Sequence, residues 1–280
     1  MTVLVMAQAC TQPQRYSPVP YPQEYEAHLD IVYKTVEDWQ GRLDVYTPKV
    51  KDNKHPLVIN IHGGGWNHGV KESQTGFGFF FDQGFVVANV EYRLESQAKA
   101  PAAIEDVRCA LIYLLDHADE LAIDPDRVVL MGASAGGHLA LMAGLLGNNR
   151  SLDGDCSYDR QIQIAAIIDK YGVTDLLPLS GLGSAKKWLG DRAHDPDFVK
   201  SVSPLYYVSS QSPSVFITHG DVDPIVPYAQ SIALYQKLQA VGVQTELLTV
   251  KGGLHGKFSS EEKKKFNEEL LIFLKNLDLI

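Results

Sequence analysis

The feature that most constrains this chain is a serine flanked by glycines, Gly132-Ala133-Ser134-Ala135-Gly136, placed between two apolar stretches of different character. Residues 128–131 form a short apolar run that predicts a buried strand, and residues 138–146 are rich in small and straight-chain residues that favour a helix. Strand, Gly-x-Ser-x-Gly and helix in that order predict a sharp, strained turn that raises the serine hydroxyl above the edge of a sheet. The alternative is a plain glycine-rich strand-to-helix turn with a capping serine.

Outside this turn, the chain alternates short apolar runs with helical stretches. Strands are expected at residues 57–61, 85–90, 128–131, 164–168, 215–218 and 245–250, and helices from Pro101, over 138–146, over 228–240 and from a capping box at Ser259. Because each strand is almost wholly apolar, the pattern predicts an α/β fold with a mostly parallel sheet covered by helices on both faces. Ligands bind such sheets beyond the carboxyl ends of the strands, where Ser134 is expected to lie.

Several stretches depart from this alternation. Residues 30–36 and 41–46 alternate in part, which predicts an antiparallel hairpin at the sheet edge. Asp124-Pro125-Asp126 predicts a turn before the strand that leads to Ser134. Residues 171–207 carry scattered glycines and prolines with no clear period, so we expect a small, partly helical cap over the site, between the sixth and seventh strands.

The composition is typical of a globular α/β protein. With 280 residues, 45% hydrophobic and 21% charged, the chain suits a single domain over residues 24–280, preceded by an extended arm at residues 1–23. The net charge of −9 argues against nucleic acid or an anionic membrane surface as the main partner. The sequence has no apolar run long enough to cross a bilayer.

The first ten residues allow two interpretations. Met1 to Met6 is apolar and Ala7-Gln8-Ala9 before Cys10 resembles a signal-peptidase site, although the basic start of a signal peptide is missing. We expect a signal remnant and a secreted or periplasmic protein, with a frayed start as the alternative. Cys10, Cys109 and Cys156 show neither metal-ligand spacing nor a disulfide framework, and Cys109 is expected in the core.

A glycine-rich segment, His62-Gly63-Gly64-Gly65-Trp66, follows the expected strand at 57–61. Bare amides that approach a ligand closely require glycine, and this segment stands where an oxyanion loop would be needed. We expect the backbone N–H groups of Gly64 and Gly65, together with that of Ala135, to bind the oxyanion of a tetrahedral intermediate. A merely flexible glycine loop is the alternative.

Two further segments at strand ends could complete a catalytic set. His219-Gly220-Asp221-Val222-Asp223-Pro224 supplies a carboxylate that could orient a histidine, and the residues alone leave Asp221 and Asp223 both open. Gly252-Gly253-Leu254-His255-Gly256 supplies a loop histidine that could act as the base for a serine hydroxyl. The order serine, aspartate, histidine is one that serine hydrolases use.

The other histidines considered are given structural interpretations. His62 and His219 are expected to hydrogen-bond within their own loops, His138 to be a helix residue and His194 a surface residue. Metal-ligand spacing of the His-Glu-x-x-His kind is absent from the sequence, so we expect catalysis without a metal or other cofactor.

These segments resemble the esterase branch of the α/β-hydrolases, and more closely the bifunctional acetylxylan/feruloyl esterase family. The matching segments, from about Leu57 to the end, are His62–Trp66, Glu91–Leu94, Pro101–Asp106, Gly132–Ala140, Ser203-Pro204, His219–Pro227 and His255-Gly256. The resemblance implies an α/β-hydrolase fold, a triad of Ser134, Asp223 and His255, and hydrolysis of acyl esters, often acetyl or feruloyl groups on plant-wall polysaccharide. It thereby favours Asp223 over Asp221.

The sequence therefore predicts a serine esterase acting through an acyl-enzyme on a small-molecule or oligosaccharide ester. Four aromatic residues are expected to contact the substrate, with plain packing as the alternative for each: Trp66, Tyr171, Trp188 and Tyr206. A general short-chain carboxylesterase, an amidase or peptidase, and a non-catalytic binding protein are the competing hypotheses. The oligomeric state stays open.

Overall fold

The computed structural model describes residues 16–50, 53–74 and 76–280. The predicted signal remnant at residues 1–10 lies outside these ranges. Of the predicted arm, residues 16–23 are described; they have no regular secondary structure, and Val19 within them is buried. No helix among the described residues is long and apolar enough to span a membrane.

The described residues build one eight-stranded sheet in the order β1-β2-β4-β3-β5-β6-β7-β8. Its strands are β1 (Tyr25–Val36), β2 (Trp39–Pro48), β3 (His55–Ile61), β4 (Val86–Val90), β5 (Ile123–Ala133), β6 (Ala166–Lys170), β7 (Ser214–Gly220) and β8 (Thr245–Val250). The β1–β2 hairpin is antiparallel and occupies one edge, as predicted, and β2 pairs antiparallel with β4. All the other pairings are parallel. The predicted α/β class and mostly parallel sheet are confirmed.

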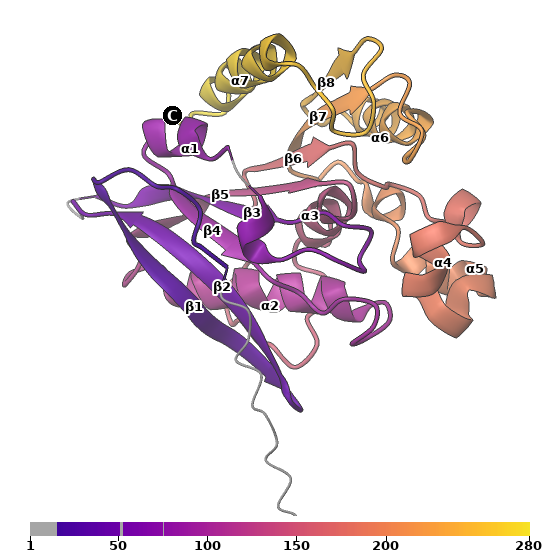
Figure 1. Cartoon of the computed structure of the whole chain (residues 1–280), viewed down its shortest axis with the longest axis horizontal. Helices are drawn as coiled ribbons and strands as arrows, with labels where there is room; N and C mark the ends of the chain where they lie inside the picture. The colour runs from indigo at the N-terminus through magenta and orange to yellow at the C-terminus, as the bar shows by residue number, and fades with distance from the viewer. Residues whose placement is uncertain (1–15, 51–52, 75) are drawn as a thin grey trace, which may run out of the picture.

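Helices cover both faces of the sheet (Figure 1). They are α1 (Gly78–Asp82), α2 (Ala102–Asp116), α3 (Ala135–Leu145), α4 (Gly183–Leu189), α5 (Pro196–Ser201), α6 (Ala229–Ala240) and α7 (Ser260–Lys275). Apolar side chains of α2, α3 and α6 pack in one core, and those of α1 and α7 pack in a second core on the opposite face. The capping box predicted at Ser259 is formed with Glu262.

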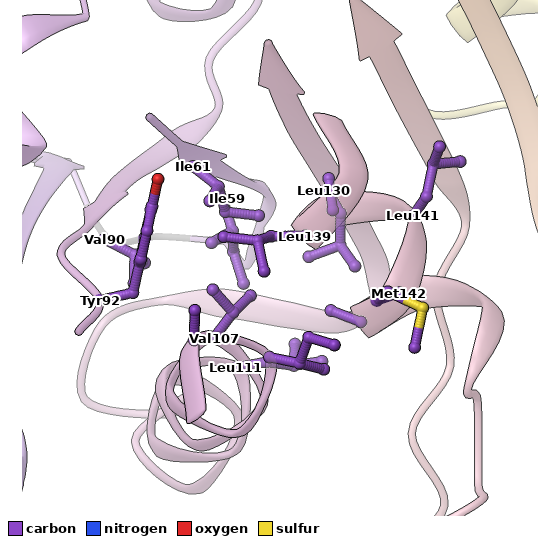
Figure 2. Close-up of a cluster of buried hydrophobic side chains, with 14 of the residues drawn as sticks. Ile59, Ile61, Val90, Tyr92, Val107, Leu111, Leu130, Leu139, Leu141 and Met142 are labelled. Atoms are coloured by element: carbon purple, nitrogen blue, oxygen red, sulfur yellow. The ribbon is translucent and has the colours of Figure 1, made fainter. Parts of the chain in front are cut away.

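The larger core lies between the sheet and the helices α2 and α3 (Figure 2). Ile59 and Leu130 of neighbouring strands meet Val107 and Leu111 of α2, and none of these side chains is exposed. Every residue of α3 is buried, so this helix needs small residues to approach the sheet closely. Packing on all sides fixes the helix that begins directly after Ser134.

The segment between β6 and β7 forms the predicted cap. It contains α4 and α5 and the short 3-10 helices η2 (Leu177–Leu179), η3 (Gly190–His194) and η4 (Pro204–Tyr207). Another short 3-10 helix, η1 (Lys71–Ser73), lies in the loop after β3. The cap is thus more helical than its irregular sequence predicts, because short helices of three to seven residues leave no readable period.

Two predictions about local structure are wrong. The turn expected at Asp124–Asp126 lies inside β5, where the register against β3 shifts after His55 and the Asp126 N–H bonds the Asp124 Oδ1 at 3.1 Å. This local hydrogen bond is typical of a turn, but here it forms at an irregularity within the strand.

The second wrong prediction concerns the cysteines. Cys109 of α2 and Cys156, in the loop after α3, form a disulfide whose Cα atoms are 5.4 Å apart. The two residues are 47 positions apart, and beside them the buried Arg108 of α2 pairs with Asp153 of the same loop at 2.7 Å. This long-range contact leaves no signal in the cysteine spacing.

Candidate active site

Ser134 lies on a strained turn between β5 and α3. Its backbone angles, φ 57° and ψ −120°, belong to a region that residues other than glycine rarely adopt. The flanking glycines are required by space, because a Cβ on Gly132 would lie 2.1 Å from the Gly136 carbonyl oxygen. A Cβ on Gly136 would lie equally close, at 2.1 Å, to the carbonyl oxygen of Ile61 in β3. The turn is therefore a nucleophile elbow in its geometry.

Three side chains from separate loops form a hydrogen-bonded row at the carboxyl ends of the strands. His255, after β8, has its Nε2 2.9 Å from the Ser134 Oγ and its Nδ1 2.6 Å from the Asp223 Oδ2. Because the carboxylate accepts only, Nδ1 carries a proton and Nε2 is left to accept the hydroxyl proton of Ser134. The row thus has the donor and acceptor order of a serine nucleophile with its base.

Asp223 is held by the turn that follows β7. Its Oδ1 accepts the backbone N–H groups of Ile225 and Val226 at 2.7 and 3.0 Å, and its side chain is fully buried. Asp221, the other candidate, is exposed, and its Oδ1 accepts the Gly252 N–H at 2.6 Å. The structure therefore brings the second aspartate, and not the first, to His255.

The glycine loop after β3 lies beside the elbow. Gly64, Gly65 and Trp66 all have positive φ angles, 116°, 56° and 58°, and the loop lines the same cavity as Ser134 and Ala135. A Cβ on Gly64 would lie 2.0 Å from the carbonyl oxygen of His68, so this position excludes any larger residue. The loop offers bare amides next to the serine hydroxyl.

The cavity above the row has a volume of about 840 Å³ and is open to solvent. The loop after β3 contributes polar side chains to its lining: Asn67, His68, Ser73 and Gln74. The cap and the loop after β7 contribute mainly apolar ones: Val173, Leu179, Leu182, Ala185, Ile225 and Val226. A ligand close to the Ser134 hydroxyl therefore meets a polar loop on one side and mainly apolar segments on the other sides.

Two of the four aromatic residues predicted to contact substrate line the cavity. Trp66 borders it, and Tyr171 packs edge-on against His255 with ring centroids 4.8 Å apart.

The prediction is wrong for Trp188, which is fully buried and stacks on Trp66 at 4.8 Å. It is also wrong for Tyr206, which lies on the surface with its ring 5.7 Å from the Lys237 Nζ. An aromatic residue in the cap can serve either the core or the surface, and only packing distinguishes them.

Several lining residues were not singled out from the sequence. Leu182 and Ile225 line the cavity although their side chains are largely exposed, at 62% and 65%. Ser184 of the cap lies close to the glycine loop after β3, with its Oγ 3.0 Å from a Cβ built on Gly65. The position of Ile225, two residues after Asp223, could have marked it as a cavity residue. The irregular sequence of the cap gives no comparable indication for Leu182 or Ser184.

Burial shifts the pKa values of groups around the row. Burial lowers the pKa of His62 and of His138 to about 4, so both rings are neutral near pH 7. Burial, with the nearby Asp223 carboxylate, raises the pKa of Tyr171 to about 12. The neutral histidines act as hydrogen-bonding groups, since the His138 ring bonds the Val202 carbonyl at 2.8 Å.

The remaining histidine predictions can be compared with the structure. His62 bonds the Gly63 carbonyl at 2.7 Å, within its own loop as expected. His219 lies in β7 and bonds both the Val226 carbonyl of the following loop, at 3.0 Å, and the Ser231 Oγ of α6, at 2.7 Å, so its partners extend beyond the expected loop. His138 belongs to α3, and His194 is exposed in the cap.

The chain is similar to a known protein family and to several known esterases. The BD-FAE family matches residues 43–238 of the chain. Esterase LipQ of Mycobacterium tuberculosis is 31% identical over 200 residues, which are 68% of this chain and 47% of LipQ. The chain spans about half the length of the curated relatives it matches.

Solved structures of similar fold include one named a carbohydrate esterase and one named an acetyl ester-xyloside bifunctional hydrolase. A truncated carbohydrate esterase from gut microbiota is 25% identical with a TM-score of 0.78, covering 90% of this chain and 98% of its own. The acetyl ester-xyloside bifunctional hydrolase of Caldicellulosiruptor lactoaceticus is 27% identical with a TM-score of 0.76, covering 87% and 90%. The family match extends over more than half of the chain, which therefore belongs to the BD-FAE family, the bifunctional acetylxylan/feruloyl esterase family of α/β-hydrolases that its motifs indicated.

Proposed function

We propose that this chain is a serine esterase that hydrolyses acyl esters through a covalent acyl-enzyme. The observation that carries the proposal is the row of hydrogen bonds from Asp223 through His255 to Ser134, which opens on a solvent-connected cavity. Membership of the BD-FAE family and similarity to LipQ support it.

In this mechanism the Ser134 Oγ attacks the ester carbonyl while the His255 Nε2 accepts its proton. The new C–O bond gives a tetrahedral oxyanion, for which the N–H groups of Gly64, Gly65 and Ala135 are the proposed donors. His255 then returns the proton to the leaving alcohol, and the acyl group stays on Ser134. A water molecule then attacks the acyl carbonyl while His255 accepts its proton. The bond from the acyl carbon to the Ser134 oxygen breaks, His255 returns the proton to that oxygen, and the carboxylic acid leaves.

We propose acetyl or feruloyl esters of plant-wall carbohydrate as the substrates. The carbohydrate esterase neighbours support this choice, as do the polar side chains of Asn67, Ser73 and Gln74 in the cavity, which suit sugar hydroxyls. Trp66 and Tyr171 are the proposed aromatic contacts for the acyl or sugar ring.

A general short-chain carboxylesterase is the second candidate function. It is favoured by the exposed apolar side chains of Leu182 and Ile225 at the cavity, which suit an ester with an apolar leaving group. The carbohydrate esterase and the general carboxylesterase would use the same acyl-enzyme mechanism. They would differ in the alcohol part of the ester that binds in the cavity.

Replacing the nucleophile tests the proposed chemistry. Ser134→Ala should lower kcat on p-nitrophenyl acetate by more than about 10³-fold and abolish labelling by a fluorophosphonate probe, because triad losses are of this size. The exposed Ser151→Ala is the matched control and should keep both activity and labelling. A folded Ser134→Ala enzyme with more than about a hundredth of the wild-type kcat would contradict nucleophilic catalysis by this serine.

A substrate panel separates the candidate functions. Rates on acetylated xylan and methyl ferulate that exceed the rate on p-nitrophenyl acetate at equal concentration would support the carbohydrate esterase. Preference for the simple aryl ester would support the general carboxylesterase. Faster cleavage of an aryl amide than of the matching ester would indicate an amidase or peptidase instead, and a wild-type protein that neither hydrolyses nor is labelled would be a binding protein.

A further inference from the structure

A second histidine lies against the carboxylate of the row. His219, near the end of β7, is fully buried, and its Nε2 is 3.2 Å from the Asp223 Oδ2 and 3.0 Å from the Val226 carbonyl oxygen. Its Nδ1 is 2.7 Å from the Oγ of Ser231, in the first turn of α6. His219 is not among the described residues that line the cavity, so it does not reach a bound substrate.

The partners of His219 fix where its proton lies. Both groups near Nε2, a carbonyl and a carboxylate oxygen, are acceptors, so Nε2 must carry a hydrogen. Burial lowers the pKa of His219, which leaves a single proton on the ring, and Nδ1 must then accept from the Ser231 hydroxyl. The ionisable groups around the ring are Asp223, His255, Tyr171 and Tyr228.

With this tautomer, three N–H groups donate to Asp223, and the His219 ring contacts the same carboxylate. The Oδ1 accepts the N–H groups of Ile225 and Val226, and the Oδ2 accepts His255 Nδ1–H at 2.6 Å with His219 Nε2–H beside it. His219 also bonds the carbonyl of Val226, the residue whose N–H holds Oδ1. One ring therefore restrains both the carboxylate and the turn that carries it.

We propose that His219, oriented by Ser231, is a positioning residue that holds Asp223 in line with His255. The proposal rests on the proposed function, in which Asp223 orients the base. Because the ring does not reach the substrate, its loss should lower kcat and leave KM unchanged. Because it acts through Asp223, its effect should disappear when that carboxylate is removed.

The first test compares His219→Leu, which removes the donor, with His219→Gln, which places an amide N–H near the Nε2 position. His219→Leu should lower kcat on p-nitrophenyl acetate about tenfold or more at unchanged KM, and His219→Gln should recover most of the loss. His55→Leu is the matched control, since this histidine also bonds a backbone carbonyl, that of Gly84, at the opposite end of β3. A wild-type kcat in His219→Leu, or equal losses in the two variants, would overturn the proposal.

The second test repeats His219→Leu in an Asp223→Ala background. We expect no further loss of kcat there, whereas the same fold-loss in both backgrounds would show a purely structural role and overturn the proposal. If His219→Leu does not fold, Ser231→Ala takes its place, with a several-fold loss expected in the presence of Asp223 and none in its absence. A wild-type kcat in Asp223→Ala alone would instead refute the proposed function.

Discussion

Three residues other than glycine that line the cavity have backbone φ angles in the left-handed region. They are Trp66, Ser134 and Tyr171, with φ of 58°, 57° and 46°. Each such angle costs about 1–3 kcal/mol and persists only where the surroundings impose it. The backbone N–H of Ser134 bonds the Lys170 carbonyl at 2.9 Å, and that of Tyr171 bonds the Thr218 carbonyl at 2.8 Å. Hydrogen bonds to the sheet therefore hold the strained backbone of Ser134 and of Tyr171, two residues that line the cavity.

A buried carboxyl close to the elbow predicts a pH-dependent stability. Asp169 accepts the Gly172 N–H at 3.0 Å on Oδ1, whereas its Oδ2 has no partner in the described part of the chain. Burial raises its pKa from 3.8 to about 7, so the folded protein keeps a proton that the unfolded chain releases. This group therefore makes the protein less stable as pH rises from about 4 to about 7, and the cost is fully present above that range.

We expect Asp169→Asn to be more stable than the wild type at pH 8, by on the order of 1–3 kcal/mol, because the amide cannot ionise. The difference should become small near pH 4, where the folded wild type keeps its proton and the unfolded chain is about half protonated. Urea denaturation at pH 8, 6 and 4 measures it, with the exposed Asp191→Asn as the control, which should change stability by less than about 0.5 kcal/mol. Equal stability of Asp169→Asn and wild type at pH 8 would contradict a buried ionising carboxylate.

At the scale of elements, an aromatic cluster joins three parts of the site. Trp66 of the glycine loop after β3 stacks on Trp188 of α4, and His138 of α3 lies edge-on to both rings at 5.1 and 5.2 Å. The His138 ring also bonds the carbonyl of Val202, at the end of α5. The cap, the glycine loop after β3 and the helix that follows Ser134 are thus packed against one another.

Shortening Trp188 tests this coupling. Trp188→Leu should lower kcat about tenfold or more, because Trp66 would lose the ring that holds its strained loop, and small displacements of oriented groups are costly. It should also lower the melting temperature, since a buried aromatic ring is lost. Trp39→Leu is the control, because Trp39 packs on Tyr33 in the edge hairpin. A Trp188→Leu variant with reduced stability and an unchanged kcat would show that the cluster supports only the core.

The motifs at strand ends could be predicted from sequence, and the cap could not. Gly64, Gly132 and Gly136 are required by close backbone approaches, and Gly65 by its positive φ of 56°, and both requirements leave a direct mark in the sequence. The choice between Asp221 and Asp223 stayed open on the residues alone, because it depends on which N–H groups the following turn presents. Trp188 was misassigned because a buried stacking partner and a substrate platform are the same residue type.

At the scale of the whole molecule, the Cys109–Cys156 disulfide ties the loop after α3 to α2. The buried Arg108 strengthens the same attachment through Asp153 at 2.7 Å and the Ala143 carbonyl at 2.9 Å. Disulfides form and persist mainly in oxidising compartments, so this bond favours the secreted or periplasmic location expected from the sequence.

Removing this disulfide should destabilise the whole domain. The double variant Cys109→Ser with Cys156→Ser should lose about 2–4 kcal/mol of unfolding free energy, because the unfolded chain regains the entropy of an open loop. Urea denaturation with and without dithiothreitol measures the loss. The reductant should destabilise the wild type and leave the double variant unchanged; equal sensitivity of the two proteins would refute the role of this bond.

His255 follows β8, whereas Ser134, Asp223 and the glycines of the oxyanion loop all precede it. Under the proposed mechanism, a polypeptide still emerging from the ribosome carries the hydroxyl, the carboxylate and the amides without any base to activate them. The proposed hydrolytic activity requires His255, which is in place only after β8 has left the exit tunnel and paired with β7. A chain that stops before residue 255 is therefore expected to carry the serine and the carboxylate and yet to be inactive.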